Sequence, residues 1–183
     1  MHNQGIRLGA CQFFMVEAEK VEELSRRGDV SAVHTLILQT QHHNHVDIFE
    51  LVRSLSRMAE GFDCAGNRIG DAPSFLTGVA VNPTVDDLEH EADRLRRKID
   101  NGAHFAMTQV FFEWRPWERF LELFGGALPI PALVAVWPVR SHKMALRLHH
   151  EGPGITVPRD MLDEMEAAGP DAAEVGRDRA IRL

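Results

Sequence analysis

Cysteine is scarce in this sequence, and long apolar runs are absent. The 183 residues contain two cysteines, Cys11 and Cys64, which give neither a disulfide framework nor the C-x-x-C spacing of a metal site. No apolar run is long enough to cross a bilayer, and the N-terminal segment lacks a signal-peptide core because Glu17 and Glu19 follow its short apolar patch. We therefore expect a cytoplasmic protein, in a reducing compartment, with no membrane partner.

Net positive charge is absent as well. The formal net charge is -7, and a negative chain with scattered Lys and Arg is a poor candidate for binding a nucleic-acid backbone. The G-x-S-x-G elbow of hydrolases, the P-loop of NTPases and the G-x-G-x-x-G fingerprint of dinucleotide folds do not occur. We expect no nucleic-acid partner, and no sequence motif supports any of these three enzyme classes.

One strand–helix–strand unit is legible between residues 74 and 109. Its strands are apolar almost throughout, as in parallel strands that helices cover on both faces. Thr84 is the expected N-cap of the helix, with Asp87 in a capping-box-like position. Asn101 and Gly102 supply a left-handed stop. This unit indicates the α/β class.

Similar patterns continue along the chain. Apolar runs predict strands over 33–39, 75–81, 104–112 and 131–137. Helices are predicted over 16–27, 46–59, 115–125, 141–150 and 158–168. The charged tail over 169–183 is expected to fray. About four strands, each followed by a helix, give either an open sheet or part of a (β/α)8 barrel, which needs eight such units.

Four segments carry a more specific pattern. They are PSFLTGVAVNP (73–83), DRLRRKIDNGAHFAMTQVFF (93–112), PALVAVWPVRS (131–141) and HHEGPGITVPRDML (149–162). These segments resemble the methylenetetrahydrofolate reductase family, flavoprotein (β/α)8 barrels of one-carbon metabolism, and the order R-K, G-A, T-Q in the second is a family hallmark. The resemblance covers roughly residues 20–180. It implies that residues 1–183 form a single partial barrel of about four consecutive βα units, strands four to seven, to which residues 1–30 are only loosely assigned.

The resemblance implies an oxidoreductase that uses FAD and NAD(P)H. The intact family enzyme passes a hydride from NAD(P)H to FAD and then to 5,10-methylenetetrahydrofolate. The product is 5-methyltetrahydrofolate, in tetrahydrofolate interconversion and methionine biosynthesis. No segment matches the family's acidic first strand or its final strand, and Gln41 and His42 stand where the Gly-Asp of its Thr-Gly-Asp motif is expected. An alternative is a non-catalytic fragment that binds flavin or a partner chain only. Exposed edge strands would favour self-association or a partner chain that completes the barrel.

The resemblance also assigns site residues. The helix after the strand 75–81 inherits contacts to the ribityl, phosphate and adenine portion of FAD through Glu91, Arg94, Arg97 and Lys98. Arg97 and Lys98 suit a diphosphate because they are charge-assisted donors. Backbone groups at Ala80 and Asn82 would meet the edge of the flavin ring. Gln109 would bind the pterin of the folate, and the same site would take the nicotinamide. We expect the cationic turn of the helix and Gln109 to open onto a shared crevice.

Each of these assignments has a structural alternative. The helix charges also fit a solvated face, with Glu91 paired to Arg94 and Lys98. Asn82, before Pro83, fits an ordinary turn. The amide of Gln109 fits a cap on the backbone of the next loop, and its neighbour Thr108 is expected to be structural.

The histidines His42, His43 and His45 suggest a third hypothesis, a metal site. Neutral imidazoles at this spacing can bind zinc or nickel. A polar loop is the alternative, because Asp47 is the only carboxylate or thiol nearby that would complete a ligand set. The three tryptophans are expected to be packing residues.

Overall fold

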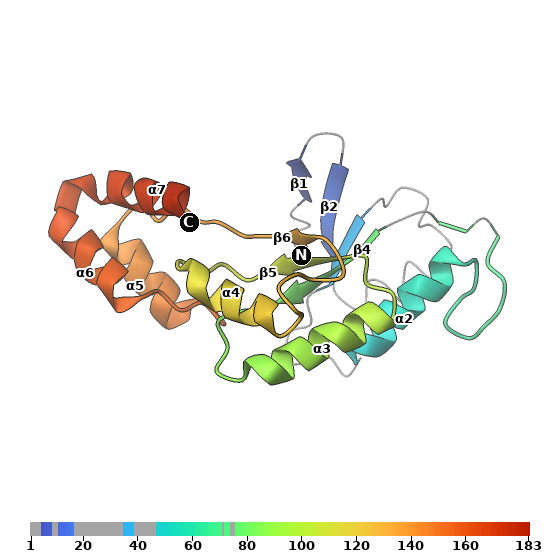
Figure 1. The fold of residues 1–183 in the computed structure, drawn as a ribbon. Helices are drawn as coiled ribbons and strands as arrows, with labels where there is room; N and C mark the ends of the chain where they lie inside the picture. Colours follow the sequence, from blue (N-terminus) through green and yellow to red (C-terminus); the bar gives the residue numbers. More distant parts are fainter. Residues whose placement is uncertain (1–4, 9–10, 17–34, 39–46, 71, 74–75) are drawn as a thin grey trace. The chain divides into compact units, whose positions relative to one another are not determined.

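The computed structural model describes residues 5–8, 11–16, 35–38, 47–70, 72–73 and 76–183. It has the α/β architecture that the sequence predicts, with helices and a largely parallel sheet (Figure 1). The described strands form one sheet in the order β1-β2-β3-β4-β5-β6. Their bounds are Gly5–Leu8 (β1), Cys11–Val16 (β2), Thr35–Leu38 (β3), Leu76–Val81 (β4), Phe105–Thr108 (β5) and Ala132–Leu133 (β6).

The hairpin of β1 and β2 was not predicted. These two strands are antiparallel, with Gly5 opposite Phe14, whereas β2 with β3 and β3 with β4 are parallel. A four-residue strand such as β1 is too short to give a periodicity signal. Val16, the expected first residue of a helix, is the last residue of β2, and the rest of that predicted helix lies outside the described residues.

The described helices follow the predicted pattern closely, except at the C-terminus. Their bounds are Ile48–Ala59 (α2), Leu88–Asp100 (α3), Trp114–Glu122 (α4), His142–Glu151 (α5), Arg159–Ala168 (α6) and Ala172–Arg182 (α7), with a short 3-10 helix, η1, over Gly169–Asp171. Residues 169–182, within the tail that we expected to fray, are helical. Ala172 and Gly176 are buried, and Gly176 lies so close to the backbone of Val139 that a larger side chain would clash. None of the described helices has the length and apolar character that a bilayer crossing requires.

The chain divides into two compact units. Residues 1–80 and 93–106 form the first unit, and residues 81–92 and 107–183 form the second. In the first unit α2 lies beside α3 (Figure 1). The carboxylate of Asp47 caps α2 by accepting a bond from the Phe49 amide. The predicted apolar stripe of α2 is buried, and consists of Ile48, Leu51, Val52, Leu55 and Met58.

Helix α3 begins later than expected. Its N-terminal cap is Asp87, whose carboxylate accepts a hydrogen bond of 2.9 Å from the His90 amide. The prediction of Thr84 as the cap is wrong, because the amide and hydroxyl of Thr84 both donate to the side-chain oxygen of Asn82. A local side-chain turn thus competes with the helix for Thr84.

The end of α3 is as predicted. Gly102 has a φ of 105°, its amide donates to Ile99, and the Ala103 amide donates to Lys98. These two bonds form a Schellman motif. The Cα of Gly102 approaches the side chain of Ser56 so closely that a Cβ would overlap it, so this glycine sets both the helix stop and the packing of α3 against α2.

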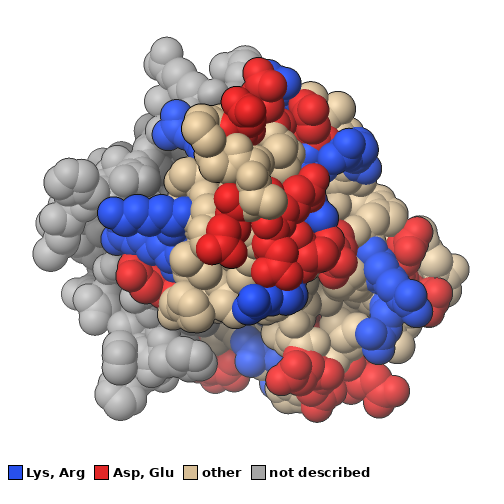
Figure 2. Space-filling model, turned by 90° about the vertical axis from the view of Figure 1, so that its left-hand side faces the viewer, with Lys and Arg blue, Asp and Glu red and all other residues tan. Residues whose placement is uncertain are grey.

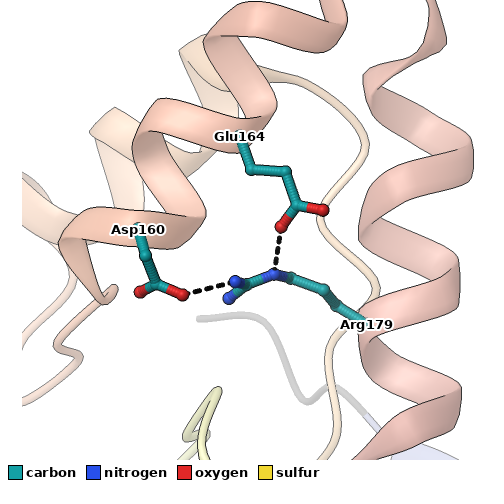
Figure 3. Close-up of polar contacts among 3 residues, drawn as sticks. All are labelled: Asp160, Glu164 and Arg179. Atoms are coloured by element: carbon teal, nitrogen blue, oxygen red, sulfur yellow. Dashed lines mark hydrogen bonds and ion pairs between the residues drawn. The ribbon is translucent and has the colours of Figure 1, made fainter.

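The second unit has its own core between α5, α6 and α7 (Figure 1). Its buried members are Val139, Ala145, Val157, Met161, Leu162, Met165 and Ala172. Arg179 on α7 donates to Asp160 and Glu164 on α6 (Figure 3). This clamp fixes α7 along α6.

The strands β5 and β6 are shorter than predicted because side chains take their backbone partners. The amide of Val110 donates to the side chain of Gln109, just after β5 ends. The amide of Ala135 donates to Thr108 Oγ1 at 3.0 Å, so β6 is limited to two residues. Thr108 is buried, and this bond bears out its predicted structural role.

Of the three tryptophans, Trp117 alone is buried. It is 4% exposed and stacks between Phe111 and Phe120. Trp114 and Trp137 are 42% and 40% exposed. The ring of Trp114 still packs against Phe111, with the ring centres 6.1 Å apart, so the expected packing role is confirmed for Trp114 and Trp117. Trp114 is the first residue of α4, and Trp137 lies in the segment between β6 and α5. At such positions spacing alone does not separate a packed ring from an exposed one.

Candidate functional site

Lys98 is a buried cation on α3, in the first unit. It is 5% exposed, and its ammonium donates a hydrogen bond of 2.6 Å to the carbonyl of Ala80, next to the end of β4. A buried ammonium needs such a partner because removing a charge from water is costly. The contact ties the helix to the end of the strand. The alternative of a solvated charged face is therefore wrong at Lys98.

Arg97, the neighbouring cation, is exposed. Its guanidinium carbon lies 3.6 Å from the centre of the Phe49 ring on α2. Stacking uses the face of the guanidinium, while its N–H groups point outward in the plane and can donate to an anion. Arg94, one turn earlier, is half-buried. Arg97 is thus the better placed of these cations to meet a phosphate in solution.

Asn82 lies in the second unit, directly after β4. Its backbone amide donates to the carboxylate of Glu91 at 3.0 Å. Its side-chain oxygen accepts the two bonds from Thr84, and its side-chain nitrogen donates to the carbonyl of Gly154 at 3.0 Å. Asn82 is therefore a turn residue, as its structural alternative predicted, and it also holds a segment 72 residues further along the chain.

Gln109, in the same unit, directly follows the neighbouring strand β5. Its backbone amide donates to the carbonyl of Val81 at 2.7 Å, which places the ends of β4 and β5 side by side. Its side-chain oxygen accepts a bond of 2.9 Å from the Val110 amide, and its side-chain nitrogen donates to the carbonyl of Pro153 at 3.1 Å. The side chain caps the following backbone, as the alternative predicted, and reaches the same distant segment as Asn82.

That distant segment is the turn Gly152–Ile155 between α5 and α6. The amide of Ile155 donates to the carbonyl of Gly152, and Gly154 has a φ of 70°. Pro followed by Gly at the centre is typical of a type II turn. The dipeptide Pro-Gly signals such a turn in the sequence, but nothing in the sequence indicates that Asn82 and Gln109 hold it. Phe49 was likewise missed, because an aromatic beside a buried stripe has no distinctive spacing.

Other candidate sites are not supported by the described residues. The described part of the chain has no group of three His, Cys, Asp or Glu side chains that could hold a metal ion, and His42, His43 and His45 lie outside it. A shallow pocket in the second unit includes none of the predicted site residues. It is lined by Phe111, Phe112, Val136, Trp137, Met161, Gly176, Arg179, Ala180 and Leu183.

Charges of both signs share the surface. On the face drawn in Figure 2, Lys and Arg are interspersed with Asp and Glu over the described residues, and acidic side chains gather near its centre. This part of the face is not the continuous basic surface that a nucleic-acid backbone would require.

The sequence of the chain matches a known family over most of its length. The family model for methylenetetrahydrofolate reductase matches residues 22–183. The chain belongs to the methylenetetrahydrofolate reductase family. This confirms the resemblance that the four sequence segments carry.

Two similar proteins carry the name methylenetetrahydrofolate reductase. A probable methylenetetrahydrofolate reductase (NADPH) of Caenorhabditis elegans is 27% identical over 169 residues, which cover 87% of this chain and 23% of that protein. Methylenetetrahydrofolate reductase 1 of Schizosaccharomyces pombe is 25% identical over 114 residues, which cover 60% of this chain and 19% of that protein. The chain thus spans about a quarter or less of the length of these relatives.

A solved structure has the same fold. It is an uncharacterized protein from Clostridium thermocellum that binds two copies of 5-methyl-5,6,7,8-tetrahydrofolic acid. The TM-score is 0.63 at 13% sequence identity, over 97% of this chain and 61% of the other. At this identity the similarity supports the α/β fold of this methylenetetrahydrofolate reductase family member. The roles of its site residues, and a shared crevice between the cationic turn and Gln109, stay predictions.

Proposed function

We propose that the chain is part of a methylenetetrahydrofolate reductase-like flavoprotein, which reduces 5,10-methylenetetrahydrofolate to 5-methyltetrahydrofolate with NAD(P)H via FAD. The observation that carries this proposal is the family match over residues 22–183. The folate ligand named for the Clostridium thermocellum structure supports it. Within it, residues 1–183 are a single partial barrel, strands four to seven, in the cytoplasm.

The residues present fit a flavin dinucleotide at Arg97. Its exposed guanidinium, which lies over the Phe49 ring, would donate to the diphosphate oxygens, with Arg94 beside it on α3. Lys98 would act differently from our expectation, because its ammonium already holds the carbonyl of Ala80. It would fix the end of β4, against which the flavin edge would lie. When bound, FAD supplies the hydride acceptor and donor that no side chain provides.

The folate would be recognised at Gln109. A carboxamide offers a donor and an acceptor together, which suits the amide-like edge of a pterin. Glu91 would act through the backbone of Asn82, to which it is bonded, and so would shape the strand end rather than carry charge to the flavin.

Flavin titration tests the cofactor part of the proposal. The purified chain should bind FAD, which is measured by the visible absorbance and quenched fluorescence of the flavin. Arg97→Ala should weaken binding about tenfold or more, because a charge-assisted contact to phosphate is lost. Arg53→Ala, which removes an exposed cation from α2, is the matched control. Equal FAD affinity in all three proteins would remove Arg97 from the proposed site.

Kinetics test the two half-reactions separately. Oxidation of NAD(P)H with menadione as acceptor reports the first, and folate reduction reports the second. Gln109→Ala should lower the second rate more than the first, because its amide contacts the pterin in this proposal. A loss of both rates in proportion would argue against a folate-specific role.

A non-catalytic fragment that binds flavin or a partner chain only is the second candidate. It is favoured by Gln41 and His42, which replace the family's Gly-Asp, and by the short span of the match along the relatives. FAD binding without any NAD(P)H oxidation would select this candidate. A metal site at His42, His43 and His45 ranks last, and metal analysis of untagged protein would decide it.

A further inference from the structure

Two side-chain amides at neighbouring strand ends hold one exposed turn. Asn82 follows β4 and Gln109 follows β5, and the bond from the Gln109 amide to Val81 joins these ends. Asn82 donates to the carbonyl of Gly154, and Gln109 donates to the carbonyl of Pro153. The two acceptors are successive residues, so the turn is fixed at both of its central positions.

The orientation of each amide is determined by its own strand end. The oxygen of Gln109 accepts from the Val110 amide, and the oxygen of Asn82 accepts from Thr84. Each nitrogen must therefore face the turn, since both turn atoms are acceptors. This network settles the assignment of oxygen and nitrogen without reference to a ligand.

The turn is shaped to reach these amides. Gly154 has a φ of 70°, and a Cβ added to it would lie 3.0 Å from the side-chain nitrogen of Asn82. Only glycine allows the backbone so close in this conformation. Pro153 and Gly154 are exposed, so the bonds that hold the turn are accessible to competing groups in solution.

We propose that Asn82 is a positioning residue that holds the turn Gly152–Ile155 across the Gln109 amide and thereby lowers the affinity of that amide for a pterin. This inference rests on the proposed function, in which Gln109 binds the folate. The carbonyl of Pro153 occupies one of the two N–H donors of the Gln109 amide, and the ligand competes with that carbonyl for it. The ligand binds when the turn has moved away, and the bond from Asn82 determines the population of this open state.

The expected size of the effect follows from the strength of one bond. A neutral hydrogen bond changes an equilibrium by a factor of about five. Apparent affinity scales with the population of the open state while that population is small. Loss of the bond between Asn82 and Gly154 should therefore strengthen ligand binding by up to about fivefold. A merely structural role would weaken binding instead.

The test compares Asn82→Ala with Thr84→Ala in the full chain. Binding of 5-methyltetrahydrofolate is measured by calorimetry, and hydrogen exchange of residues 150–157 is measured by mass spectrometry. Asn82→Ala should bind the folate up to about fivefold more tightly and exchange faster at the turn. Thr84→Ala removes the hydroxyl bond to the Asn82 oxygen but keeps the bond from the Thr84 backbone amide, which still orients the side chain, so both readouts should match the wild type. If Asn82→Ala does not fold, Asn82→Asp keeps the acceptor for Thr84, removes the donor, and should exchange faster at the turn.

The outcomes separate this inference from the proposed function. Faster exchange in Asn82→Ala with unchanged or weaker folate binding would overturn the role of Asn82 and leave folate binding intact. Unchanged exchange in both Asn82 variants would also overturn it. If neither wild type nor variant binds 5-methyltetrahydrofolate, both the proposed folate site and this inference are contradicted. Binding by the variant alone would support both.

Discussion

At the scale of single residues, Lys98 is the side chain whose role changes most between sequence and structure. Lys98→Ala should lower the free energy of unfolding by about 2–3 kcal/mol, because it removes a buried aliphatic stem and the bond to Ala80. Lys98→Met keeps the stem and should cost about 1 kcal/mol, since Ala80 is exposed and water can replace the ammonium at its carbonyl. Urea unfolding followed by circular dichroism measures both.

The control for Lys98 is Arg53→Ala. Arg53 forms an exposed ion pair with Glu50, and such pairs contribute about 0–1 kcal/mol. A Lys98→Ala protein as stable as Arg53→Ala would contradict the structural role. FAD titrations of Lys98 variants should be made where each variant is folded, so that lost stability is not read as lost affinity.

Single residues also show where sequence reasoning stops. The spacing of Lys98, beside Glu91 and Arg94 on one face, predicts a charged surface, because sequence does not reveal that a carbonyl lies within reach of the ammonium. The same limit applies to Gln109 and Asn82. The sequence correctly predicts that these two polar side chains lie at the ends of strands. Their partners, Pro153 and Gly154, lie 44 and 72 residues away, and no local pattern connects them.

At the scale of elements, the stop of α3 at Gly102 offers a sharp test. Gly102→Ala should lower the free energy of unfolding by about 1–3 kcal/mol, because alanine is strained at a φ of 105° and its Cβ would meet Ser56. Gly66→Ala carries similar backbone strain, at a φ of 87°, without a close backbone or core neighbour. Gly66→Ala should therefore lower the free energy of unfolding by less than Gly102→Ala does.

A double-mutant cycle separates strain from contact at Gly102. Ser56→Gly removes the side chain that the new Cβ would meet, so the double variant should lose less stability than the sum of the two single changes. Additive losses would show that α2 and α3 do not approach each other at this point. Thermal unfolding and urea unfolding each measure the stability of the four proteins in this cycle.

The clamp between α6 and α7 should depend on pH. The hydrogen bond from Arg179 lowers the pKa of the Asp160 carboxyl from its ordinary value of 3.8 (Figure 3). A lowered pKa in the folded state stabilises the fold above the ordinary pKa, and this stabilisation is lost as the pH falls through the folded-state pKa. Asp160 is largely exposed, so the contribution is under about 1 kcal/mol.

Asp160→Asn tests the clamp. The variant should be less stable than the wild type at pH 7, and the difference should shrink as the pH falls below about 3.8. Added salt should also reduce it, because exposed pairs are screened. A stability difference that is the same at pH 7 and at pH 3 would assign the effect to helix packing instead of to the charge on Asp160.

Element boundaries were predictable where a strong local rule applied. The stripe of α2 and the glycine stop of α3 follow from spacing and from backbone conformation, so both were predicted. The start of α3 was misplaced because Thr84 bonds to Asn82, a competition between two local motifs. Helix α7 was missed because its buried residues are small, Ala172 and Gly176, and a hydrophobicity pattern does not register small residues that pack closely.

At the scale of the whole molecule, the sheet formed by the described strands has two edges. In the order β1 to β6, the outer strands β1 and β6 each have one neighbour among the described strands. Unpaired backbone groups at an edge invite pairing with another chain. Strand β6 also exposes Leu133 at 42%, and Val136 follows it at 49%.

We therefore expect the purified chain to self-associate through β6. Leu133→Lys should shift the population toward monomer, because a charge on an edge strand opposes pairing between copies. Ile181→Lys is the matched control, since Ile181 is 75% exposed but lies on the helix α7 and not on a strand. Sedimentation velocity over a range of concentrations measures the shift. Association that Ile181→Lys abolishes and Leu133→Lys leaves intact would place the contact on the helices and leave β6 available for a different partner chain.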